Sequence, residues 1–171
     1  MILQNTSYRK VCCEDLLVRK VHTALMKIKN RVAGTGKSGI VTIDIPNQKV
    51  MERTAVQIEE NEVTICLSVG LPANGRRVLA KEAEKLFFQL LSDVIMNSVF
   101  VIRENELKEA VELIDQQQAI RELLKKYGYV AFIGNGSILP RGSGVSDKPL
   151  VSDAIPFRSP KEMEVSISVP H

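Results

Sequence analysis

The feature that most constrains the fold is a change of pattern near residue 34. Residues 11–31 carry apolar side chains on one helical stripe, namely Cys13, Leu17, Val21, Ala24 and Ile28. Glycines then follow at positions 34, 36 and 39, and "GIVTIDI" alternates after them with many β-branched residues. The sequence therefore predicts an amphipathic helix, a glycine-bearing loop and a strand at about 39–45, in that order.

The loop contains Gly36-Lys37-Ser38, the tripeptide with which a phosphate-binding Walker A loop ends. A Walker A loop reads G-x-x-x-x-G-K-[ST] and lies between a strand and a helix, so that backbone N–H groups and the helix N-terminus surround the phosphates. Here the position of the first glycine is Arg31, and the predicted order is helix, loop, strand. The segment is therefore not a Walker A loop.

The remaining patterns define the fold class. Strands are predicted at 54–59 and 62–69, joined as a hairpin, at 129–133 ("YVAFI", short and buried) and at 161–169 ("KEMEVSISV"). Helices are predicted at about 78–100 and 104–127, the second ending at the C-cap glycine Gly128. The apolar positions of the helix at 78–100 include Leu79, Ala83, Leu86, Leu90, Val94 and Ile95. The Gly/Pro-rich stretch 134–160 is expected to lack regular structure. Together these elements predict an α+β domain, a mostly antiparallel sheet with three to four helices packed against it.

Composition excludes several classes of protein. The three cysteines, of which Cys12 and Cys13 are adjacent, make no disulfide framework, and at least one of this pair is expected in the core. A reducing cytoplasm is the simplest location. Two histidines without a Cys-x-x-Cys motif offer no zinc site, and polar residues interrupt the most apolar stretch, so no membrane partner is expected. No nucleophile–base pair is recognisable, so no catalytic residue is assigned and the chain alone is expected to be inactive.

Charge is distributed unevenly along the chain. Residues 1–53 carry ten Lys and Arg against four Asp and Glu, whereas residues 54–171 carry thirteen against sixteen. A basic first third is compatible with a surface for nucleic acid or nucleotide phosphates, and equally with an ordinary solvated helix. Aromatic residues make up 5% of the chain, without tryptophan, so base-stacking platforms are sparse and contact with nucleic acid would be mainly electrostatic.

Three loops combine glycine with a basic residue. Glycines let backbone N–H groups approach an anion, while Lys and Arg supply charge. The alternative is that the loops are plain connectors that need glycine for a positive φ. The candidate nucleotide- or anion-binding residues are Gly34, Gly36, Lys37 and Ser38 in the first loop, Arg76 and Arg77 in "GLPANGRR", and Arg141 in "LPRGSG".

At these loops the chain becomes recognisable. The segments "GTGKSGIVTIDIPNQKVMERT", "VGLPANGRRVLAKEA", "YVAFIGNGSILPRGSG" and "PFRSPKEMEVSISVP" resemble, in the same order, the N-terminal region of the predicted ATPases of the ABC class. These are soluble bacterial and organellar proteins, distinct from the transporters. The likeness runs from about residue 8 to the C-terminus. In the family, the true Walker A loop comes shortly after the segment similar to "VSISVP", and this sequence stops at His171 before it.

The resemblance implies a domain organisation and a set of partners. We expect an α+β accessory domain at 1–133, a Gly/Pro-rich loop at 134–160, and a strand at 161–171 that leads into an ATPase core absent from the sequence. The resemblance implies no cofactor for these residues, but ATP and Mg for the full-length protein, an ATPase. The implied partners are the missing core of the same chain and a second copy in a homodimer. RNA is a further partner, since some relatives are associated with RNA handling.

Two functions follow from these observations. In the first, the domain belongs to the nucleotide machinery, and its glycine loops contact ATP or transmit its state to the core. In the second, it binds RNA or protein through a basic surface comprising Lys27, Lys29, Arg31, Lys37, Arg76 and Arg77. The first is favoured, because the motif-like segments are glycine loops and not a continuous basic stripe. The strand at 161–169 is expected to add to this domain's own sheet or to pair with a neighbouring copy, because an unpaired strand exposes N–H and C=O groups.

Overall fold

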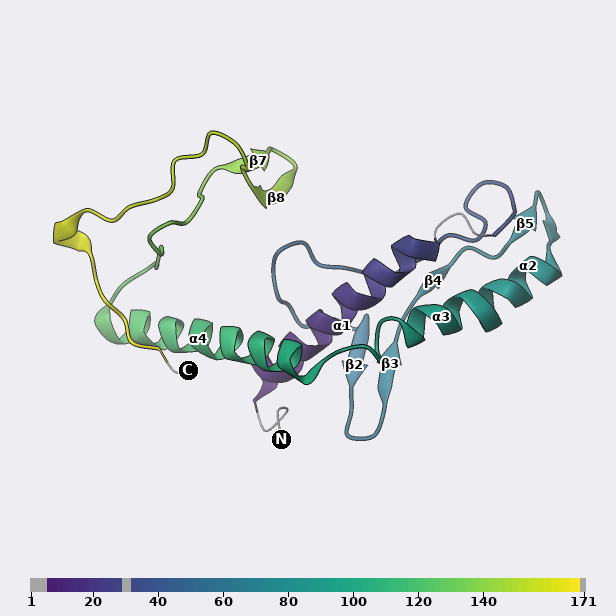
Figure 1. The fold of residues 1–171 in the computed structure, drawn as a ribbon, viewed down its shortest axis with the longest axis horizontal. Helices are drawn as coiled ribbons and strands as arrows, with labels where there is room; N and C mark the ends of the chain where they lie inside the picture. The colour runs from purple at the N-terminus through teal and green to yellow at the C-terminus, as the bar shows by residue number, and fades with distance from the viewer. Residues whose placement is uncertain (1–5, 29–31, 170–171) are drawn as a thin grey trace. The chain divides into compact units, whose positions relative to one another are not determined.

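The computed structural model describes residues 6–28 and 32–169. The chain forms two compact units (Figure 1). The N-terminal unit comprises residues 1–46 and 50–111, and the C-terminal unit comprises residues 47–49 and 112–171. We describe each unit by itself.

The N-terminal unit combines helices with short antiparallel strand pairs. Its elements are α1 (Ser7–Ile28), β1 (Val41–Thr42), β2 (Val56–Ile58), β3 (Val63–Ile65), β4 (Ser68–Val69), β5 (Ala73–Asn74), β6 (Arg77–Val78), α2 (Ala80–Lys85), the π-helical turn η1 (Leu86–Leu90), α3 (Leu91–Met96) and the first turns of α4 (Glu104–Tyr127). The α2, η1 and α3 segments follow one another directly and occupy most of the predicted helix 78–100. The α+β class predicted from sequence is confirmed.

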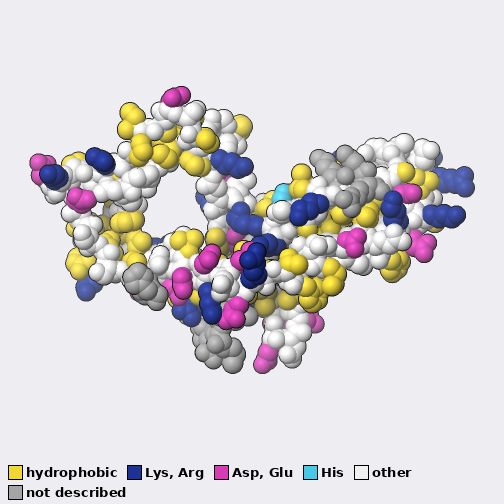
Figure 2. Space-filling model, viewed as in Figure 1, with side chains coloured by type: hydrophobic (Ala, Val, Ile, Leu, Met, Phe, Trp, Pro, Cys, Tyr) yellow, Lys and Arg dark blue, Asp and Glu magenta, His cyan; other side chains and the backbone are white. Residues whose placement is uncertain are grey.

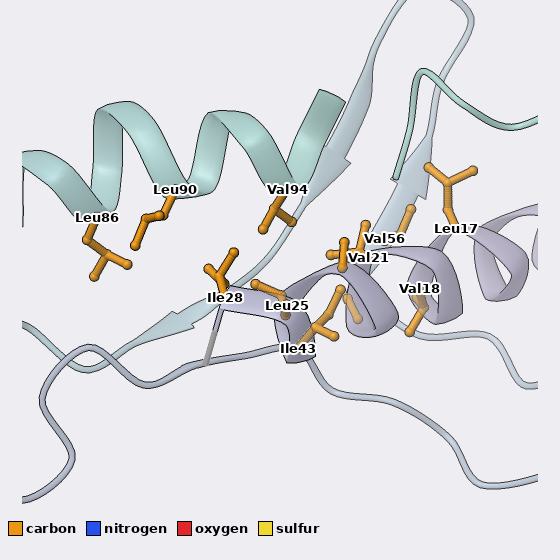
Figure 3. Close-up of a cluster of buried hydrophobic side chains, with 12 residues drawn as sticks. Leu17, Val18, Val21, Leu25, Ile28, Ile43, Val56, Leu86, Leu90 and Val94 are labelled. Carbon is orange, nitrogen blue, oxygen red and sulfur yellow. The ribbon is translucent and has the colours of Figure 1, made fainter. Parts of the chain in front are cut away.

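The core of this unit lies between α1 and the α2–η1–α3 helix. All five residues of the predicted α1 stripe are buried, and Leu86, Leu90 and Val94 bury the facing side of the second helix (Figure 3). Ile43 and Val56 from the strand regions complete the same cluster. The helical spacing of apolar residues in the sequence therefore predicted the buried stripe of α1 and the three buried residues of the second helix, whereas Leu79, Ala83 and Ile95 of the second predicted stripe are only partly buried.

The strands form separate two-stranded ladders. The predicted hairpin is confirmed, because β2 pairs with β3 from Val56↔Ile65 to Ile58↔Val63. The strand predicted at 39–45 is much shorter, and its two paired residues join β4 through Val41↔Val69 and Thr42↔Ser68. The alternation of apolar and polar residues thus predicted where the strands lie. How many residues of each strand are paired depends on partners that are distant in sequence.

Helix α1 also buries two acidic residues, which the apolar stripe did not predict. Glu14 accepts a hydrogen bond from the backbone N–H of Ile58 (3.0 Å) and so binds the end of β2. Asp15 receives two hydrogen bonds from Arg19, one turn further along the helix, at 2.7 and 3.2 Å. Both cysteines of the adjacent pair are buried, Cys12 with its Sγ donating to the Ala110 carbonyl (3.2 Å).

The C-terminal unit contains the rest of α4, the strands β7 (Arg141–Ser143) and β8 (Ser146–Pro149), and the 3₁₀ turn η2 (Lys161–Met163). Helix α4 ends as predicted, because Gly128 adopts a φ of 70° and the Tyr129 N–H reaches back to the Leu124 carbonyl at 2.9 Å.

Two predictions for the C-terminal unit are wrong, and a third is contradicted in one of its two alternatives. Residues 129–133 are exposed and form no strand, although their apolar side chains favoured one. The stretch 134–160 is not devoid of regular structure, because β7 and β8 form a hairpin there. Residues 161–169 contain η2 and then chain without regular structure, so they do not join a strand among the residues described, and their pairing with a neighbouring copy stays a prediction. Alternation predicts which side chains share a face, but a strand also needs a partner edge to accept its hydrogen bonds.

Candidate anion-binding site

The first glycine loop, residues 34–39, is folded tightly against the second, residues 70–78. We call these two segments the paired loops. Gly34 has a φ of 151°, and a side chain there would collide with that of Ser38. Gly70 lies so close to the Lys37 carbonyl oxygen that a Cβ atom would clash with it. Glycine is thus required at position 34 because the first loop packs against itself, and at position 70 because the second loop packs against the first.

Hydrogen bonds hold the paired loops together along their length. The Thr35 N–H donates to the Ala73 carbonyl (2.9 Å), and the Gly39 N–H donates to the Gly70 carbonyl (2.7 Å). The Gly70 N–H in turn reaches the Ile40 carbonyl (2.8 Å). Two segments more than thirty residues apart therefore form one substructure.

Ser38 lies at the centre of this substructure. Its hydroxyl is 2.6 Å from the Thr35 carbonyl and 2.9 Å from the Ala73 carbonyl, which share its single proton, and it accepts the Ala73 N–H at 3.1 Å. In a Walker A loop the corresponding hydroxyl coordinates Mg²⁺. Here it joins the two loops, which gives the Gly-Lys-Ser tripeptide a structural use.

Thr35 is a second connecting residue that sequence reasoning missed. Its hydroxyl accepts the Gly75 N–H at 3.1 Å and lies 3.4 Å from the Ala73 carbonyl. The hydroxyls of Thr35 and Ser38 contact only backbone carbonyl and N–H groups, and such groups are present in almost every residue type. No sequence pattern could therefore have indicated their partners.

The paired loops carry three of the predicted cationic residues. Lys37 lies on the first loop, Arg76 at the tip of the β5–β6 hairpin, and Arg77 opposite Asn74 in that hairpin. All three are exposed, and within residues 6–28 and 32–169 none forms an ion pair with an acidic side chain. Figure 2 shows Lys and Arg side chains at the end of the unit that carries β5 and α2. This end is the best candidate for an anion site.

Other predicted residues lie elsewhere. Arg141 begins β7 in the C-terminal unit, so its loop belongs to a different compact body from the paired loops. Lys27 lies in the last turn of α1. Lys29 and Arg31 fall outside the described residues.

The acidic side chains that the structure describes do not form a metal site. Over the part of the chain that the structure describes, no group of three or more His, Cys, Asp or Glu side chains could hold a metal ion. One carboxylate does contact the residue just before the first of the paired loops, because Glu82 in α2 accepts the Ala33 N–H at 3.1 Å. None of the helices described is both long enough and apolar enough to cross a bilayer.

Comparison with known proteins assigns the family. Residues 2–101 match the model of the N-terminal region of ATPases of the ABC class, and residues 103–171 match the model of a P-loop domain. No curated protein matches the chain. The first match covers more than half of the sequence and includes both paired loops, and the two matches meet immediately before α4 begins. The chain therefore belongs to the family of ABC-class ATPases, with the paired loops in the N-terminal region of that family.

Proposed function

We propose that the N-terminal unit contributes to the nucleotide-dependent function of an ABC-class ATPase by contacting nucleotide phosphate at the paired loops. The observation that carries this proposal is the Ser38–Ala73 connection, which holds Lys37 on the same substructure as Arg76 and Arg77. Three exposed cations on a fixed support can meet one polyanion, whereas cations on independent loops would first have to be brought together.

The backbone of the first loop supports the same conclusion. Among the described residues, no acceptor is found for the N–H groups of Gly36 and Lys37, which are both exposed. Successive backbone donors beside a cation form the kind of concave anion site known as a nest. The residues present fit a polyphosphate.

They do not fit the Mg²⁺ that accompanies ATP. The Ser38 hydroxyl donates to the Ala73 carbonyl and accepts the Ala73 N–H, so it is already occupied. Magnesium is usually held by carboxylates together with phosphates and water. We therefore assign no magnesium ligand to the paired loops. In this proposal ATP and Mg²⁺ are cofactors of a Walker A site, and no G-x-x-x-x-G-K-[ST] segment occurs in the 171 residues.

Two measurements test the proposal. The first is binding of a non-hydrolysable ATP analogue, followed by isothermal titration in low salt. Replacing Lys37 or Arg77 by Ala is expected to weaken binding roughly tenfold or more, since hydrogen bonds to charged groups contribute about 1.5–3 kcal/mol. Lys148→Ala, in the β7–β8 hairpin, is the matched control. Equal affinity for the wild type and all variants would remove the paired loops from the nucleotide site.

The second measurement is ATP hydrolysis. The 171-residue chain is expected to show no turnover, because the arrangement needed to cradle a γ-phosphate is absent from its sequence. A chain that also carries a Walker A loop after these residues is expected to hydrolyse ATP, and Lys37→Ala is expected to alter its rate. Turnover by the 171 residues, abolished by Lys37→Ala, would instead make Gly36-Lys37-Ser38 a catalytic phosphate loop.

The second candidate function is binding of RNA or protein by the basic surface. The exposure of Lys37, Arg76 and Arg77 without acidic partners in the described part of the chain favours it. Such binding would weaken steeply with salt and would not depend on ATP. Titrating the chain with a single-stranded RNA at 50 and 200 mM salt, with and without the ATP analogue, separates the two functions.

The remaining features of the proposal concern assembly and location. ATP-bound ABC-class cores are expected to associate in pairs, so we propose a homodimer of the full-length protein, with the ATPase core of the same chain as the nearest partner. A reducing cytoplasm is consistent with the three cysteines, which form no disulfide. Sedimentation of the full-length protein with and without ATP tests the assembly.

A further inference from the structure

Asparagine is followed by glycine twice in the chain, at Asn74-Gly75 and at Asn135-Gly136. This dipeptide is unusually reactive, because glycine has no Cβ atom to keep its backbone nitrogen away from the asparagine side chain. That nitrogen can attack the side-chain carbonyl carbon and convert the amide to an acid without an enzyme. The two dipeptides differ in how the folded chain holds them.

Asn74-Gly75 lies at the tip of the second of the paired loops. Asn74 ends β5 and faces Arg77 across the hairpin, and Gly75 takes the first turn position with a φ of 57°. Two-residue hairpin turns favour glycine with a positive φ at this position. Among the described residues, no hydrogen bond holds the Asn74 side-chain amide. The amide can therefore turn toward the Gly75 nitrogen.

A hydrogen bond between the paired loops protects the Gly75 nitrogen. Its N–H donates to the hydroxyl oxygen of Thr35 at 3.1 Å. The nitrogen must lose this proton before it acts as a nucleophile, so the bond to Thr35 opposes the reaction. The bond is exposed to solvent, and such bonds open more readily than buried ones. The contact between the paired loops therefore sets how often Asn74 can react.

Asn135-Gly136, in the C-terminal unit, is held by more bonds. The Asn135 side-chain nitrogen donates to Glu164 and its oxygen accepts the Ser159 N–H, both at 2.7 Å. The Gly136 N–H donates to the Phe157 carbonyl at 2.8 Å. Both the amide and the attacking nitrogen are thus bound there, whereas at Asn74 the nitrogen alone is bound. Asn74 is the more reactive of the two.

We propose that Asn74 is a site of spontaneous deamidation, that Thr35 protects it while the paired loops are joined, and that its conversion weakens anion binding by these loops. The last part rests on the function proposed above. The first two parts concern the chain alone.

The reaction balances with water as the only reagent. A base takes the Gly75 N–H proton, the nitrogen forms a bond to Cγ of Asn74, and the side-chain nitrogen leaves as ammonia. Water then opens the resulting five-membered succinimide by breaking one of its two carbonyl C–N bonds. Opening at Cγ gives aspartate, and opening at the main-chain carbonyl gives isoaspartate. Nothing is oxidised or reduced, and an amide and water become a carboxylate and ammonium.

Either product changes the cationic end of the N-terminal unit. A carboxylate at position 74 faces Arg77 directly, at a cross-strand position where opposite charges attract. There it competes with phosphate for the guanidinium. Isoaspartate also lengthens the main chain by one atom and so disturbs the hairpin that carries Arg76 and Arg77. Neither product reverts to asparagine, so the change in charge is permanent.

Peptide mapping by mass spectrometry measures conversion at each asparagine during incubation at mildly alkaline pH, without any nucleotide. Asn74 is expected to convert faster than Asn135 in the folded chain. In concentrated urea the two rates are expected to become similar, because only the shared Asn-Gly sequence then matters. Conversion of Asn74 no faster than that of Asn135 in the folded chain, or the same ratio of rates in urea, would overturn the proposal.

Variants of Thr35 test the protection. Thr35→Val removes the acceptor and is expected to raise the rate at Asn74 about twofold to tenfold, the factor that corresponds to one ordinary hydrogen bond. Thr35→Ser keeps the hydroxyl and should react as the wild type does. Slow maleimide labelling of the buried Cys13 thiol checks that the core stays folded in both variants. An unchanged rate in Thr35→Val contradicts the protective role.

Asn74→Asp supplies the converted charge directly. Its binding of inorganic triphosphate, followed by isothermal titration in low salt, is expected to be about twofold to fivefold weaker than that of the wild type, as one cross-strand charge pair implies. Asn74→Gln, which stays neutral, is the matched control. Equal affinity of the two variants contradicts the effect on anion binding. Absence of triphosphate binding by the wild type would overturn the proposed function and this effect with it, whereas the rates at Asn74 decide the modification independently.

Discussion

The two units differ in how much of their apolar surface is buried. In the N-terminal unit, α1, the strand regions and the α2–η1–α3 helix enclose one cluster, with Val21 and Leu86 fully buried. In the described part of the C-terminal unit, Ile114 is the only hydrophobic side chain that is buried, and Val130 is completely exposed. The N-terminal unit therefore has the core expected of an independent folding unit, whereas the C-terminal unit is held mainly by helix α4 and local hydrogen bonds.

The boundary between the units falls within α4. The two family matches meet at residues 101–103, but the compact N-terminal unit continues to residue 111. The first turns of α4 account for the difference. Glu106 binds Lys20 of α1 at 2.6 Å, and the Ala110 carbonyl accepts a hydrogen bond from Cys12. The helix that begins the P-loop match therefore starts inside the N-terminal unit, where its first turns contact α1.

The largest expected effect concerns the thiols of the N-terminal unit. Burial, with the neighbouring Glu14 carboxylate, raises the pKa of Cys13, and Cys12 is also buried, whereas Cys66 is exposed. Because thiolate is the reactive form, Cys12 and Cys13 should react with a maleimide only when the unit opens, on the order of a thousandfold or more slower than Cys66. Mass spectrometry of the labelled protein checks this at pH 8. Rapid labelling of all three thiols would show that the N-terminal core opens readily, and the contrast in packing would not hold.

Truncating a side chain should lower the free energy of unfolding in the N-terminal core but not at an exposed position of the C-terminal unit. Leu86→Ala removes a fully buried side chain and is expected to lower the free energy of unfolding by about 2–5 kcal/mol. Val130→Ala, at a fully exposed position of the C-terminal unit, should stay within about 0.5 kcal/mol of the wild type. Urea unfolding monitored by circular dichroism measures both. A comparable loss in Val130→Ala would mean that this side chain is packed in solution, and the contrast between the units would not hold.

Two glycines sharpen the comparison at the level of loops. Gly70→Ala places a Cβ against the Lys37 carbonyl oxygen and is expected to cost about 1–3 kcal/mol, because one of the paired loops must move. Gly144→Ala, in the turn between β7 and β8, meets no atom within 4 Å and should stay within about 0.5 kcal/mol of the wild type. Thermal unfolding of the two variants is the measurement. Equal melting temperatures would indicate that the paired loops are not packed as described.

The smallest expected effect is the anchoring of α4. Hydrogen bonds from Lys20 and from the Arg103 N–H lower the pKa of Glu106. A lowered pKa in the folded state means that the charged form stabilises the fold above the ordinary carboxyl pKa of about 4.3, and that this contribution is lost as pH falls through the lowered value. Glu106→Gln should therefore be slightly less stable than the wild type at pH 7, and the difference should shrink in acid.

A double-mutant cycle provides the control for that effect. If the Lys20–Glu106 pair anchors α4, Lys20→Gln combined with Glu106→Gln should destabilise by less than the sum of the two single changes. Glu104→Gln, which loses an ion pair to Lys108 within α4 itself, should show no coupling to Lys20. Additive effects for Lys20 and Glu106 would mean that the pair contributes nothing to holding the helix.

The sequence by itself determined the elements whose stabilisation is local or periodic. Helical spacing predicted α1, the second helix and α4 together with Leu17, Val21, Leu86 and Leu90 of the core, because a helix satisfies its own backbone hydrogen bonds and an apolar stripe needs only to be covered. The order of loop and strand also excluded a Walker A loop at Gly36-Lys37-Ser38, and the glycine at 128 predicted the end of α4.

Tertiary structure alone decided the features that depend on distant partners. Residues 129–133 and 161–169 have strand-like patterns but form no strand, since no edge in the described chain accepts their hydrogen bonds. Ser38 and Thr35 join the paired loops by contacting backbone groups, which carry no sequence signature. The tyrosines around Gly128 meet segment 165–168 across a turn of the chain that no local pattern encodes. The hydrogen-bonding partner of a strand or a side chain is supplied by residues far away along the chain, and only folding brings such residues together.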